Sequence, residues 1–235
     1  MKNVAVVGAA GFVGTQVARA VAASGRYNLI SVLRNDPAIA LLAKADIVVY
    51  AANPARRFQA EKDPMQDFEE TVEKTAGFLA LSHAKRFVLV STLSCRTQLN
   101  TSYGRNRRAC ELIALQAGSL VIRLGPMYGG DRIDDTLHKI ISGGPVFVAA
   151  QTRYAYVDVS WVGKKIVELL DEPGGIREIG ARNAISLGEL RDYFSSKSTF
   201  SGIDDTQIPE GAADGPDARD IFRFAEEERR KGICK

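Results

Sequence analysis

Short apolar runs alternate with helix-patterned stretches along the first half of the chain. The runs are rich in β-branched residues and predict five strands, at Val4–Val7, Leu29–Leu33, Ile47–Tyr50, Phe87–Val90 and Leu120–Arg123. Strands that alternate with helices form parallel sheets, because each parallel crossover needs a helix-length segment. The pattern therefore predicts an α/β fold, with a doubly wound parallel sheet and helices on both of its faces.

The segments between these runs carry apolar residues at helical spacing. Val13, Val17 and Val21 fall on one side of a helix that follows the first strand. Two longer helices are predicted, from about Met65 to His83 and from about Gly104 to Gln116. These helices are long enough to cover the sheet and to bury its apolar residues.

The pattern loosens after Gly125, where we expect a smaller C-terminal lobe. It contains a predicted helix near Asp134–Ile141, an extended piece at Val146–Ala149 and a helix at Trp161–Leu170. From residue 204 to residue 235, nine acidic residues face six basic ones, so we expect a loose arm that ends in a charged helix at Asp217–Lys231. The predicted domains are a sheet domain at 1–125, a lobe at 126–203 from which a strand and a helix return to the sheet, and the arm at 204–235.

The second and third predicted strands lie close together in the sequence. Arg34 follows the second strand and Asp46 opens the third, so that eleven residues lie between them. One parallel crossover takes about a dozen residues, so a short helix fits there, but a helix, a strand and a second helix do not. A doubly wound sheet with strand order 3-2-1-4-5-6 would therefore lack one edge strand.

A glycine-rich turn joins the first predicted strand to the first predicted helix, with the sequence Gly8-Ala9-Ala10-Gly11-Phe12-Val13-Gly14. In such a turn the first glycine permits a tight bend, the second lets the backbone approach a pyrophosphate, and the third lets helix and strand pack closely. The start of the helix offers unpaired N–H groups and the positive end of its dipole to phosphate. The turn therefore predicts a dinucleotide-binding, Rossmann-like domain; the alternative is a tight strand–helix turn without a ligand.

The end of the second predicted strand bears on the choice of dinucleotide. A dinucleotide site usually places an acid there to bind the adenosine ribose, but this chain has Leu33 at that position and Arg34 after it. An arginine can pair with a 2′-phosphate, so we expect NADP, with NAD as the alternative because Asp36 can still reach a ribose. The other interpretation of Arg34 is a solvated surface residue.

Composition narrows the class of protein. The chain has 235 residues, of which 46% are hydrophobic and 25% charged, and a formal net charge of only +3. The small charge argues against nucleic-acid binding, and no apolar run reaches the roughly 20 residues that span a bilayer. Cys95, Cys110 and Cys234 lack metal-ligand spacing, so we expect reduced thiols, no metal site and a cytoplasmic protein. His83 and His138 have no partner at ligand spacing and are interpreted as surface or packing residues.

Positive charge is concentrated in one part of the chain. Between Lys74 and Glu111 there is no acidic residue. The same segment contains six basic residues, which are Lys85, Arg86, Arg96, Arg105, Arg107 and Arg108. This excess suits an anionic ligand, such as the phosphates of a cofactor or substrate, with a solvated helix face as the alternative for Arg105 and Arg108.

Several segments together resemble one family. In chain order they are GAAGFVG, ADIVVYAAN, RFVLVSTLS, YGRNRRACE, VIRLGPMYGG and RYAYVDVSWVGKKIVELL, over about residues 1–190. In this order and spacing the chain resembles the extended short-chain dehydrogenase/reductases, the NAD(P)-dependent epimerase/dehydratase family, which act mostly on nucleotide sugars. The resemblance implies an NAD(P)-dependent oxidoreductase or epimerase in which the nicotinamide carries the hydride chemistry.

The resemblance also implies catalytic residues. Family members use a Ser or Thr, a Tyr and a Lys four residues later, and the matching positions here are Thr92, Tyr103 and Arg107. Tyr103 would transfer a proton while Thr92 holds the substrate oxygen, and a nearby cation favours the phenolate. Arg107 keeps the charge of the family's Lys but cannot release a proton near neutral pH. A dinucleotide-binding sensor or partner subunit with little or no turnover is therefore the alternative function.

Further positions are implied to bind cofactor or substrate. The implied cofactor-binding residues are Gly8, Ala10, Gly11, Phe12, Val13, Gly14, Arg34, Ala51, Ala52, Asn53, Leu124 and Met127. For a small-molecule substrate such as a nucleotide sugar, the implied binding residues are Ser94, Tyr128 and Arg153. Family members commonly dimerise through the helix that carries the Tyr, so the resemblance permits a homodimer to which Ile113 and Leu115 contribute.

Overall fold

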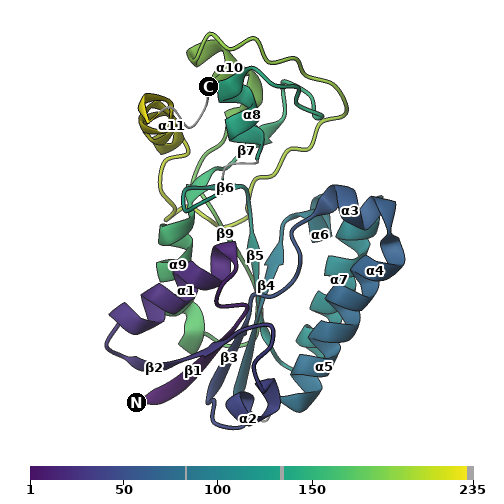
Figure 1. Ribbon diagram of the computed structural model, residues 1–235, viewed down its shortest axis with the longest axis vertical. Helices are drawn as coiled ribbons and strands as arrows, with labels where there is room; N and C mark the ends of the chain where they lie inside the picture. The colour runs from purple at the N-terminus through teal and green to yellow at the C-terminus, as the bar shows by residue number, and fades with distance from the viewer. Residues whose placement is uncertain (83, 133–134, 232–235) are drawn as a thin grey trace. The chain divides into compact units, whose positions relative to one another are not determined.

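The structure, a computed structural model, describes residues 1–82, 84–132 and 135–231. Its central feature is a six-stranded sheet with the order β2-β1-β3-β4-β5-β9 (Figure 1). The strands are β1 (Lys2–Val7), β2 (Tyr27–Val32), β3 (Ile47–Tyr50), β4 (Arg86–Thr92), β5 (Leu120–Leu124) and β9 (Gly175–Ile179). The pairings of β1 with β2 and β3, of β3 with β4 and of β4 with β5 are parallel. The predicted α/β, Rossmann-like fold is confirmed.

The short connection after β2 determines which strand lies at the edge of the sheet. β2 is the first strand in the sheet order, and the five-residue helix α2 (Ala38–Leu42) crosses from it to β3. Leu42 anchors this helix, because its side chain is fully buried in the core of the sheet domain. The prediction that one edge strand is missing is therefore confirmed.

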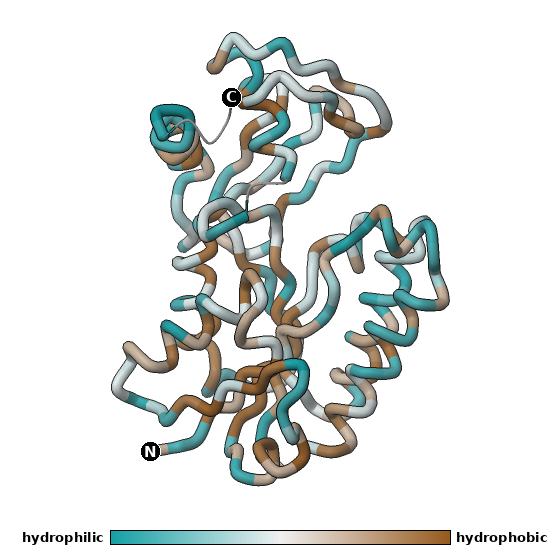
Figure 2. Tube along the Cα trace, in the orientation of Figure 1, coloured by the Kyte–Doolittle hydropathy of each residue, from teal (hydrophilic) through white to brown (hydrophobic). Residues whose placement is uncertain are grey.

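Helices cover both faces of the sheet. On one face lie α1 (Phe12–Ala23) and α9 (Val159–Glu168), and on the other lie α5 (Lys74–Leu81) and α7 (Ser102–Gln116) (Figure 1). Figure 2 shows hydrophobic residues along the central strands that these helices enclose. This is the doubly wound arrangement that the alternating pattern predicts.

The segment predicted as one helix over 65–83 is not regular throughout. It consists of α4 (Pro64–Phe68), a π-helical turn at Glu69–Glu73, and α5. A further helix, α3 (Arg57–Lys62), precedes it and was not predicted, because six residues are too few to show an apolar period. His83, the predicted end of the helix, lies outside the described residues, as does Cys234.

The chain divides into two compact units, Met1–Leu124 with Ser160–Arg177, and Gly125–Val159 with Glu178–Lys235. The first unit contains most of the sheet, to which α9 and the start of β9 return. The elements of the second unit are β6 (Met127–Tyr128), α8 (Thr136–Ser142), β7 (Arg153–Tyr154), β8 (Val157–Asp158), β10 (Ile185–Ser186), α10 (Leu187–Tyr193) and α11 (Asp220–Arg230). This division differs from the predicted boundaries 1–125, 126–203 and 204–235, because the expected lobe and arm share one unit.

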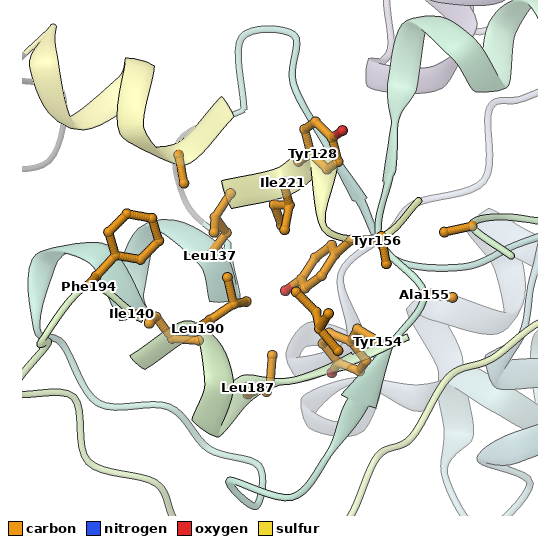
Figure 3. Packing of buried hydrophobic residues seen from close by; sticks show 14 of the residues in the cluster. Tyr128, Leu137, Ile140, Tyr154, Ala155, Tyr156, Leu187, Leu190, Phe194 and Ile221 are labelled. Atoms are coloured by element: carbon orange, nitrogen blue, oxygen red, sulfur yellow. The ribbon is translucent and has the colours of Figure 1, made fainter. Parts of the chain in front are cut away.

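The second unit has its own hydrophobic core (Figure 3). Its members include Tyr128, Leu137, Ile140, Tyr154, Leu187, Leu190, Phe194 and Ile221. Ile221 and Ala225 of α11 are fully buried in this core. The C-terminal segment is therefore packed by the apolar face of its helix, and the expectation of a loose arm is corrected.

One detail of the lobe differs from the prediction. Val146–Ala149 forms no strand, and Val146 makes one isolated bridge, to Phe200. The helix predicted from Asp134 is described from Thr136, and Asp134 itself lies outside the described residues. In this helix His138 is buried, and its Nδ1 lies 2.7 Å from Asp135 Oδ1.

Three general features concern the described part of the chain. None of its helices combines the length and the apolar character that crossing a membrane requires. Within 1–82, 84–132 and 135–231, no three His, Cys, Asp or Glu residues gather closely enough to hold a metal ion. Cys95 and Cys110 are both buried and form no disulfide.

Candidate active site

The glycine-rich turn lies at the carboxyl end of β1. Gly8 has φ +83°, a left-handed conformation that glycine adopts without steric cost, and a Cβ there would lie 2.9 Å from Ala51 O. A Cβ on Gly14 would lie 2.0 Å from Gly8 O, which is far inside van der Waals contact. Both positions therefore require glycine, because the bend, the helix and the end of β3 approach one another so closely.

Helix α1 begins within this turn, directly after Gly11. The N-cap is Gly11, which supplies no side-chain acceptor. The first N–H groups of a helix lack intrahelical partners and carry the positive end of the helix dipole. The turn therefore fits a dinucleotide pyrophosphate, which would lie against Ala10, Gly11, Phe12 and Val13.

The chain after β3 provides a second feature that fits a cofactor. Asn53 Oδ1 accepts a hydrogen bond from Thr75 Oγ1 at 3.2 Å, whereas Asn53 Nδ2 is buried and has no partner among the described residues. A buried donor without a partner is costly, so a bound group that accepts its hydrogen bond would be stabilised there. Ala51 and Ala52 precede it, and their backbone lies directly beside Gly8 of the glycine turn.

The residues after β2 form a local turn around the Asp36 carboxylate. Asp36 Oδ2 accepts a hydrogen bond from the Leu33 backbone N–H at 2.7 Å, which closes a local turn. Leu33 and Arg34 are exposed. The carboxylate of Asp36 is thus used within the chain, and Arg34 offers an exposed cation at this end of the sheet.

Thr92 ends β4, the strand beside β3, at the carboxyl edge of the sheet. Its Oγ1 donates to Ser94 Oγ at 3.4 Å and accepts from the Ser94 backbone N–H at 3.3 Å. Ser94 begins the short helix α6 (Ser94–Thr97) and is fully buried. The two hydroxyls form a polar pair at the edge where open α/β sheets bind their ligands.

Tyr103 and Arg107 lie one turn apart in the first half of α7, and their side chains meet. Arg107 Cζ lies 4.5 Å from the centre of the Tyr103 ring, within cation–π distance. Tyr103 is 6% exposed and Arg107 is 2% exposed. The Arg107 guanidinium donates to Pro54 O and to Thr71 Oγ1. It is therefore a buried, fixed cation that ties the phenol ring to the segment after β3.

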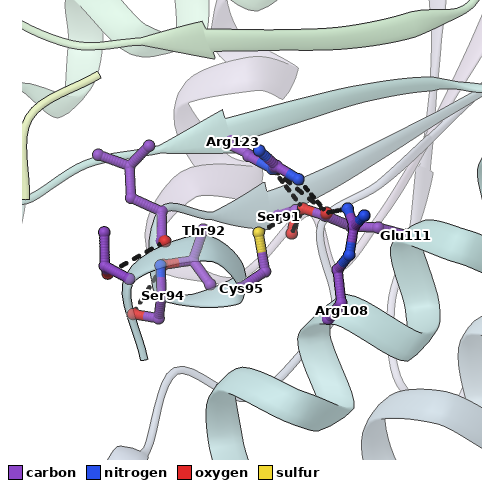
Figure 4. A network of polar contacts seen from close by, with 9 residues as sticks. Ser91, Thr92, Ser94, Cys95, Arg108, Glu111 and Arg123 are labelled. Carbon is purple, nitrogen blue, oxygen red and sulfur yellow. Dashed lines mark hydrogen bonds and ion pairs between the residues drawn. The ribbon is translucent and has the colours of Figure 1, made fainter. Parts of the chain in front are cut away.

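A buried polar cluster holds together the elements that carry these residues (Figure 4). Glu111 of α7 is fully buried and accepts hydrogen bonds from Ser91 Oγ at 2.7 Å and Arg123 Nη2 at 2.7 Å. Cys95 Sγ donates to Glu111 at 2.8 Å, and Arg108 Nη1 lies 3.2 Å from it. Burial by itself raises the pKa of Glu111, but the hydrogen bonds, from Arg123 above all, outweigh burial and hold the pKa below its usual value. The carboxylate thus joins β4, α6, α7 and β5.

The basic residues between Lys74 and Glu111 do not form one site, because they make separate contacts. Arg107 is buried in the site, and Arg108 pairs with Glu111. Arg105 Nη2 donates to Ser102 Oγ at 3.2 Å, at the start of the same helix. These contacts show that at least part of the positive charge supports the helix that carries Tyr103.

The other predicted site residues lie at the end of β5 and in the second unit. Leu124 is buried at the end of β5, and Met127 and Tyr128 form β6. The Tyr128 ring packs 5.0 Å from the Phe224 ring within the core of the second unit. Arg153 is exposed, and its Nη2 donates to a backbone carbonyl oxygen at 3.0 Å. The roles of these residues in binding stay predictions.

Helix α3 brings two charged side chains to the site that sequence reasoning missed. Arg57 Nη2 donates to Ser94 Oγ at 3.0 Å. Glu61 Oε1 accepts from the backbone N–H of Ser102 at 2.6 Å and of Tyr103 at 3.2 Å. The sequence offered one signal for these residues, the charged segment PARRFQAEK directly after ADIVVYAAN. The charged segment has no spacing typical of a known motif, so it did not stand out.

Comparison with known sequences gives one similar protein of defined activity. No protein-family model matches the chain. The ceramide reductase of Caulobacter vibrioides (strain NA1000 / CB15N) is 29% identical over 239 residues, which cover 89% of this chain and 69% of the reductase. The similarity thus extends over most of the chain at a modest level of identity.

Several solved structures share the fold. TunA, an NAD-dependent NDP-hexosamine 5,6-dehydratase involved in tunicamycin biosynthesis, superposes with a TM-score of 0.79 at 17% identity, over 98% of both chains. MoeE5 in complex with UDP-glucuronic acid and NAD gives 0.77 at 17% identity, over 97% of this chain and 99% of its own. UDP-N-acetylglucosamine 4-epimerase from Bacillus cereus gives 0.73 at 15% identity, over 97% of both chains. The chain has the fold of the extended short-chain dehydrogenase/reductases to which these enzymes belong, as its sequence motifs predict.

Proposed function

We propose that this protein is an NAD(P)-dependent oxidoreductase or epimerase that acts on a nucleotide-linked sugar. One observation carries the proposal: the Tyr103 ring packs against the buried Arg107 guanidinium. Thr92 and the glycine turn belong to the same unit and lie at the carboxyl edge of its sheet. Solved structures with the same fold include NAD-dependent enzymes of nucleotide sugars, such as MoeE5 with UDP-glucuronic acid, which supports the substrate class.

The chemistry divides between the cofactor and the chain. When bound, the nicotinamide accepts or returns a hydride. The Tyr103 phenol transfers a proton to or from the substrate oxygen, and the Thr92 hydroxyl holds that oxygen by a hydrogen bond. The Arg107 guanidinium packs against the Tyr103 ring in a buried position and so fixes the phenol in place.

The proposed cofactor is NADP, with NAD as the alternative. Gly8, Gly11 and Gly14 allow the backbone to approach a pyrophosphate, and the unpartnered Asn53 Nδ2 offers a donor. Arg34 supports NADP, since it is exposed at the end of β2 while Asp36 is hydrogen-bonded locally. Calorimetric titration with NADPH and NADH tests this choice, and the Arg34→Gln variant should lose the preference for NADPH. Equal affinity of the native protein for both would contradict the NADP assignment.

Activity is tested by following NADPH and NADH oxidation with a panel of keto-sugar nucleotides. Sugar products are analysed in parallel, because an epimerase consumes no net cofactor. Reduction or epimerisation that requires Tyr103 supports the proposal. Cofactor binding without any product from the panel would count against a nucleotide-sugar substrate. Keto-lipids belong in the same panel, since the similarity to a ceramide reductase favours ketone reduction within this class of chemistry.

A dinucleotide-binding protein with little turnover is the second candidate, and Arg107 is the observation that favours it. The guanidinium is held by Pro54 O and Thr71 Oγ1 and cannot relay a proton. The Arg107→Lys variant separates the candidates, because Lys restores a group that can exchange a proton. A large gain in turnover would show that the native residue limits catalysis. If the native protein is already an active enzyme, we expect Arg107→Lys to be less stable and to turn over no faster.

We also propose that the protein forms a homodimer through α7. A further part of the proposal is that the protein is located in the cytoplasm. Leu112 on this helix is 53% exposed, whereas Ile113 and Leu115 are partly buried against the core of the chain itself. Size-exclusion chromatography with light scattering tests the oligomeric state, and Leu112→Glu should convert a dimer through this face to a monomer.

A further inference from the structure

The π-helical turn at Glu69–Glu73 lies between α4 and α5, and the proposed chemistry gives it no role. Single π-helical turns of this kind are frequent at functional sites. Thr71 in this turn is fully buried, and its Oγ1 accepts a hydrogen bond from Arg107 Nη1. Cys110 Sγ of α7 donates to the Thr71 carbonyl oxygen at 3.3 Å. The turn is therefore packed against the helix that carries Tyr103.

Asp67 lies four residues before Thr71, in α4, and its carboxylate makes two contacts. Thr71 Oγ1 donates to Asp67 Oδ1 at 3.4 Å, and Asn106 Nδ2 of α7 donates to Asp67 Oδ2 at 2.8 Å. Asp67 is 8% exposed, whereas the acidic residues on either side of it, Asp63 and Glu69, are exposed. Burying a carboxylate costs free energy unless it is hydrogen-bonded or paired. One buried carboxylate thus joins α4, the π-helical turn and α7.

The direction of the hydrogen bonds links Asp67 to Arg107. A threonine hydroxyl has one hydrogen to donate, and Thr71 donates it to Asp67. The lone pairs of the same oxygen accept from the Arg107 guanidinium, which itself has only donors. Arg107 is 2% exposed, and a negative charge one hydroxyl group away reduces the cost of burying its positive charge. Asp67 therefore orients the Thr71 hydroxyl and compensates part of the charge of Arg107.

Arg107 in turn holds two parts of the candidate site. Its Nη2 donates to Pro54 O, in the segment after β3, and its Cζ lies 4.5 Å from the centre of the Tyr103 ring. The guanidinium is planar, so hydrogen bonds to both Nη atoms also fix the plane against which the ring packs. A change at Asp67 should therefore reach Tyr103 through Thr71 and Arg107.

We propose that Asp67 is a positioning residue of the candidate active site, which holds Arg107 through Thr71 and thereby places the Tyr103 phenol for proton transfer. The inference rests on the proposed function, in which Tyr103 transfers that proton. Asp67 lies outside the sequence segments that resemble the family. Its contacts give the arginine at position 107, where the family has lysine, a set of partners suited to a guanidinium.

The test compares Asp67→Asn with Asp63→Asn in the full chain. Both variants lose one carboxylate charge from the same part of the chain. Asp63 is the exposed N-cap of α4, where its Oδ1 accepts from the Gln66 backbone N–H at 3.0 Å, and asparagine caps a helix as well as aspartate does. Asp67→Ala is a second variant, because it also removes both acceptor atoms. Circular dichroism shows whether the variants are folded.

NMR of the guanidinium measures the hold on Arg107 without an assay of activity. The Arg107 Nη resonances, assigned by their loss in Arg107→Lys, report how fast the guanidinium rotates about its Cζ–Nε bond. We expect slow rotation in the native protein and in Asp63→Asn, and rotation about tenfold faster in Asp67→Asn, because the acceptor of the Thr71 hydroxyl loses its charge. Rotation at the native rate in both Asp67→Asn and Asp67→Ala overturns the proposal.

Turnover separates positioning from a general loss of stability. We expect kcat to fall about 10- to 100-fold in Asp67→Asn with little change in KM, since the residues proposed to bind substrate are untouched. The same substitution should have a smaller effect in the Arg107→Lys background, because an ammonium has no planar fork to hold. Equal factors in both backgrounds overturn the proposal. If the native protein turns over no substrate, the proposed function fails, and the rotation of Arg107 alone decides whether Asp67 holds the guanidinium.

Discussion

Tyr103 is the residue on which the proposed chemistry depends most directly. It is 6% exposed, and the centre of its ring lies 4.5 Å from the Arg107 guanidinium and 5.9 Å from that of Arg57. Both guanidiniums lie within cation–π distance of the ring and contribute to its fixed position.

Replacing Tyr103 by Phe removes the hydroxyl but keeps the ring and its packing. We expect turnover to fall about 10²- to 10⁴-fold, the usual contribution of a positioned acid or base. Dinucleotide affinity should change little, because the glycine turn is untouched. Steady-state kinetics and calorimetry measure the two effects. Unchanged turnover would show that another group transfers the proton.

The substitution Gly14→Ala tests the glycine turn by adding one atom, the alanine Cβ. In Gly14→Ala the new Cβ would lie 2.0 Å from Gly8 O, so the backbone of the turn must move. We expect loss of NAD(P) binding by calorimetry and a lower free energy of unfolding. Gly77→Ala is the matched control, because a Cβ there meets nothing within 4 Å in a helix. It should bind cofactor normally and be more stable by about 0.5–1 kcal/mol. Normal binding by Gly14→Ala would contradict the proposed pyrophosphate site.

At the scale of elements, the buried Glu111 cluster connects two strands and two helices. Ser91 and Arg123 belong to β4 and β5, and Cys95 belongs to α6. The elements that carry the candidate site residues are thus joined through one carboxylate. The same cluster restrains the cysteine, since burial first and the Glu111 charge second raise the pKa of the Cys95 thiol and keep it protonated.

Removing the Glu111 charge should destabilise the protein strongly. Glu111→Gln leaves Arg123 buried without its counter-charge, so the free energy of unfolding should fall by about 3–5 kcal/mol. Arg108→Gln is the control, since the Arg108 side chain is 37% exposed and its ion pair should contribute about 1 kcal/mol or less. Urea unfolding followed by circular dichroism measures both. Equal losses of unfolding free energy in the two variants would show that burial of the Glu111–Arg123 pair is not what makes Glu111→Gln destabilising.

The same substitution reports on acid stability. The folded pKa of Glu111 lies below its ordinary value of 4.5, so its stabilising contribution is fully present above that value and is lost as the pH falls through the folded pKa. The native protein should therefore lose stability on acidification more steeply than Glu111→Gln. A parallel pH dependence of the two would contradict the depressed pKa.

At the scale of the whole molecule, the described chain buries hydrophobic residues in the sheet domain and, in a separate core, in the second unit. The glycine turn, which we propose binds the cofactor, belongs to the first unit, and so does Trp161, the single tryptophan of the chain. Binding of NAD(P) should therefore stabilise the first unit by mass action, by about 2.7 kcal/mol at one hundred times Kd.

This stabilisation is measured as a rise in the Tm followed by Trp161 fluorescence, with NADPH and NADH in separate titrations. Gly14→Ala should show no rise, because its turn no longer accepts the pyrophosphate. A native protein whose Tm is independent of both dinucleotides would contradict cofactor binding altogether.

The sequence predicted the strands of the sheet well, because buried parallel strands are continuous apolar runs. Ile47–Tyr50 has the predicted bounds, and the other four strands of the first half differ by a few residues at their ends. The second half was harder, since its strands have only two residues each apart from β9. The C-terminal helix was predicted, but its burial was not. Ile221 and Ala225 are buried, yet the surrounding sequence is so rich in charge that it indicated an exposed helix.

The sequence by itself determined the features that depend on local spacing. Eleven residues between Arg34 and Asp46 exclude a further strand, and the glycine turn follows a strand and opens a helix. The tertiary structure decided the contacts between residues distant in the chain. Arg107 meets Thr71 and Pro54, at separations of 36 and 53 residues, and Arg57 meets Ser94 at a separation of 37. No periodicity encodes such pairs, because they depend on how whole helices pack against the sheet.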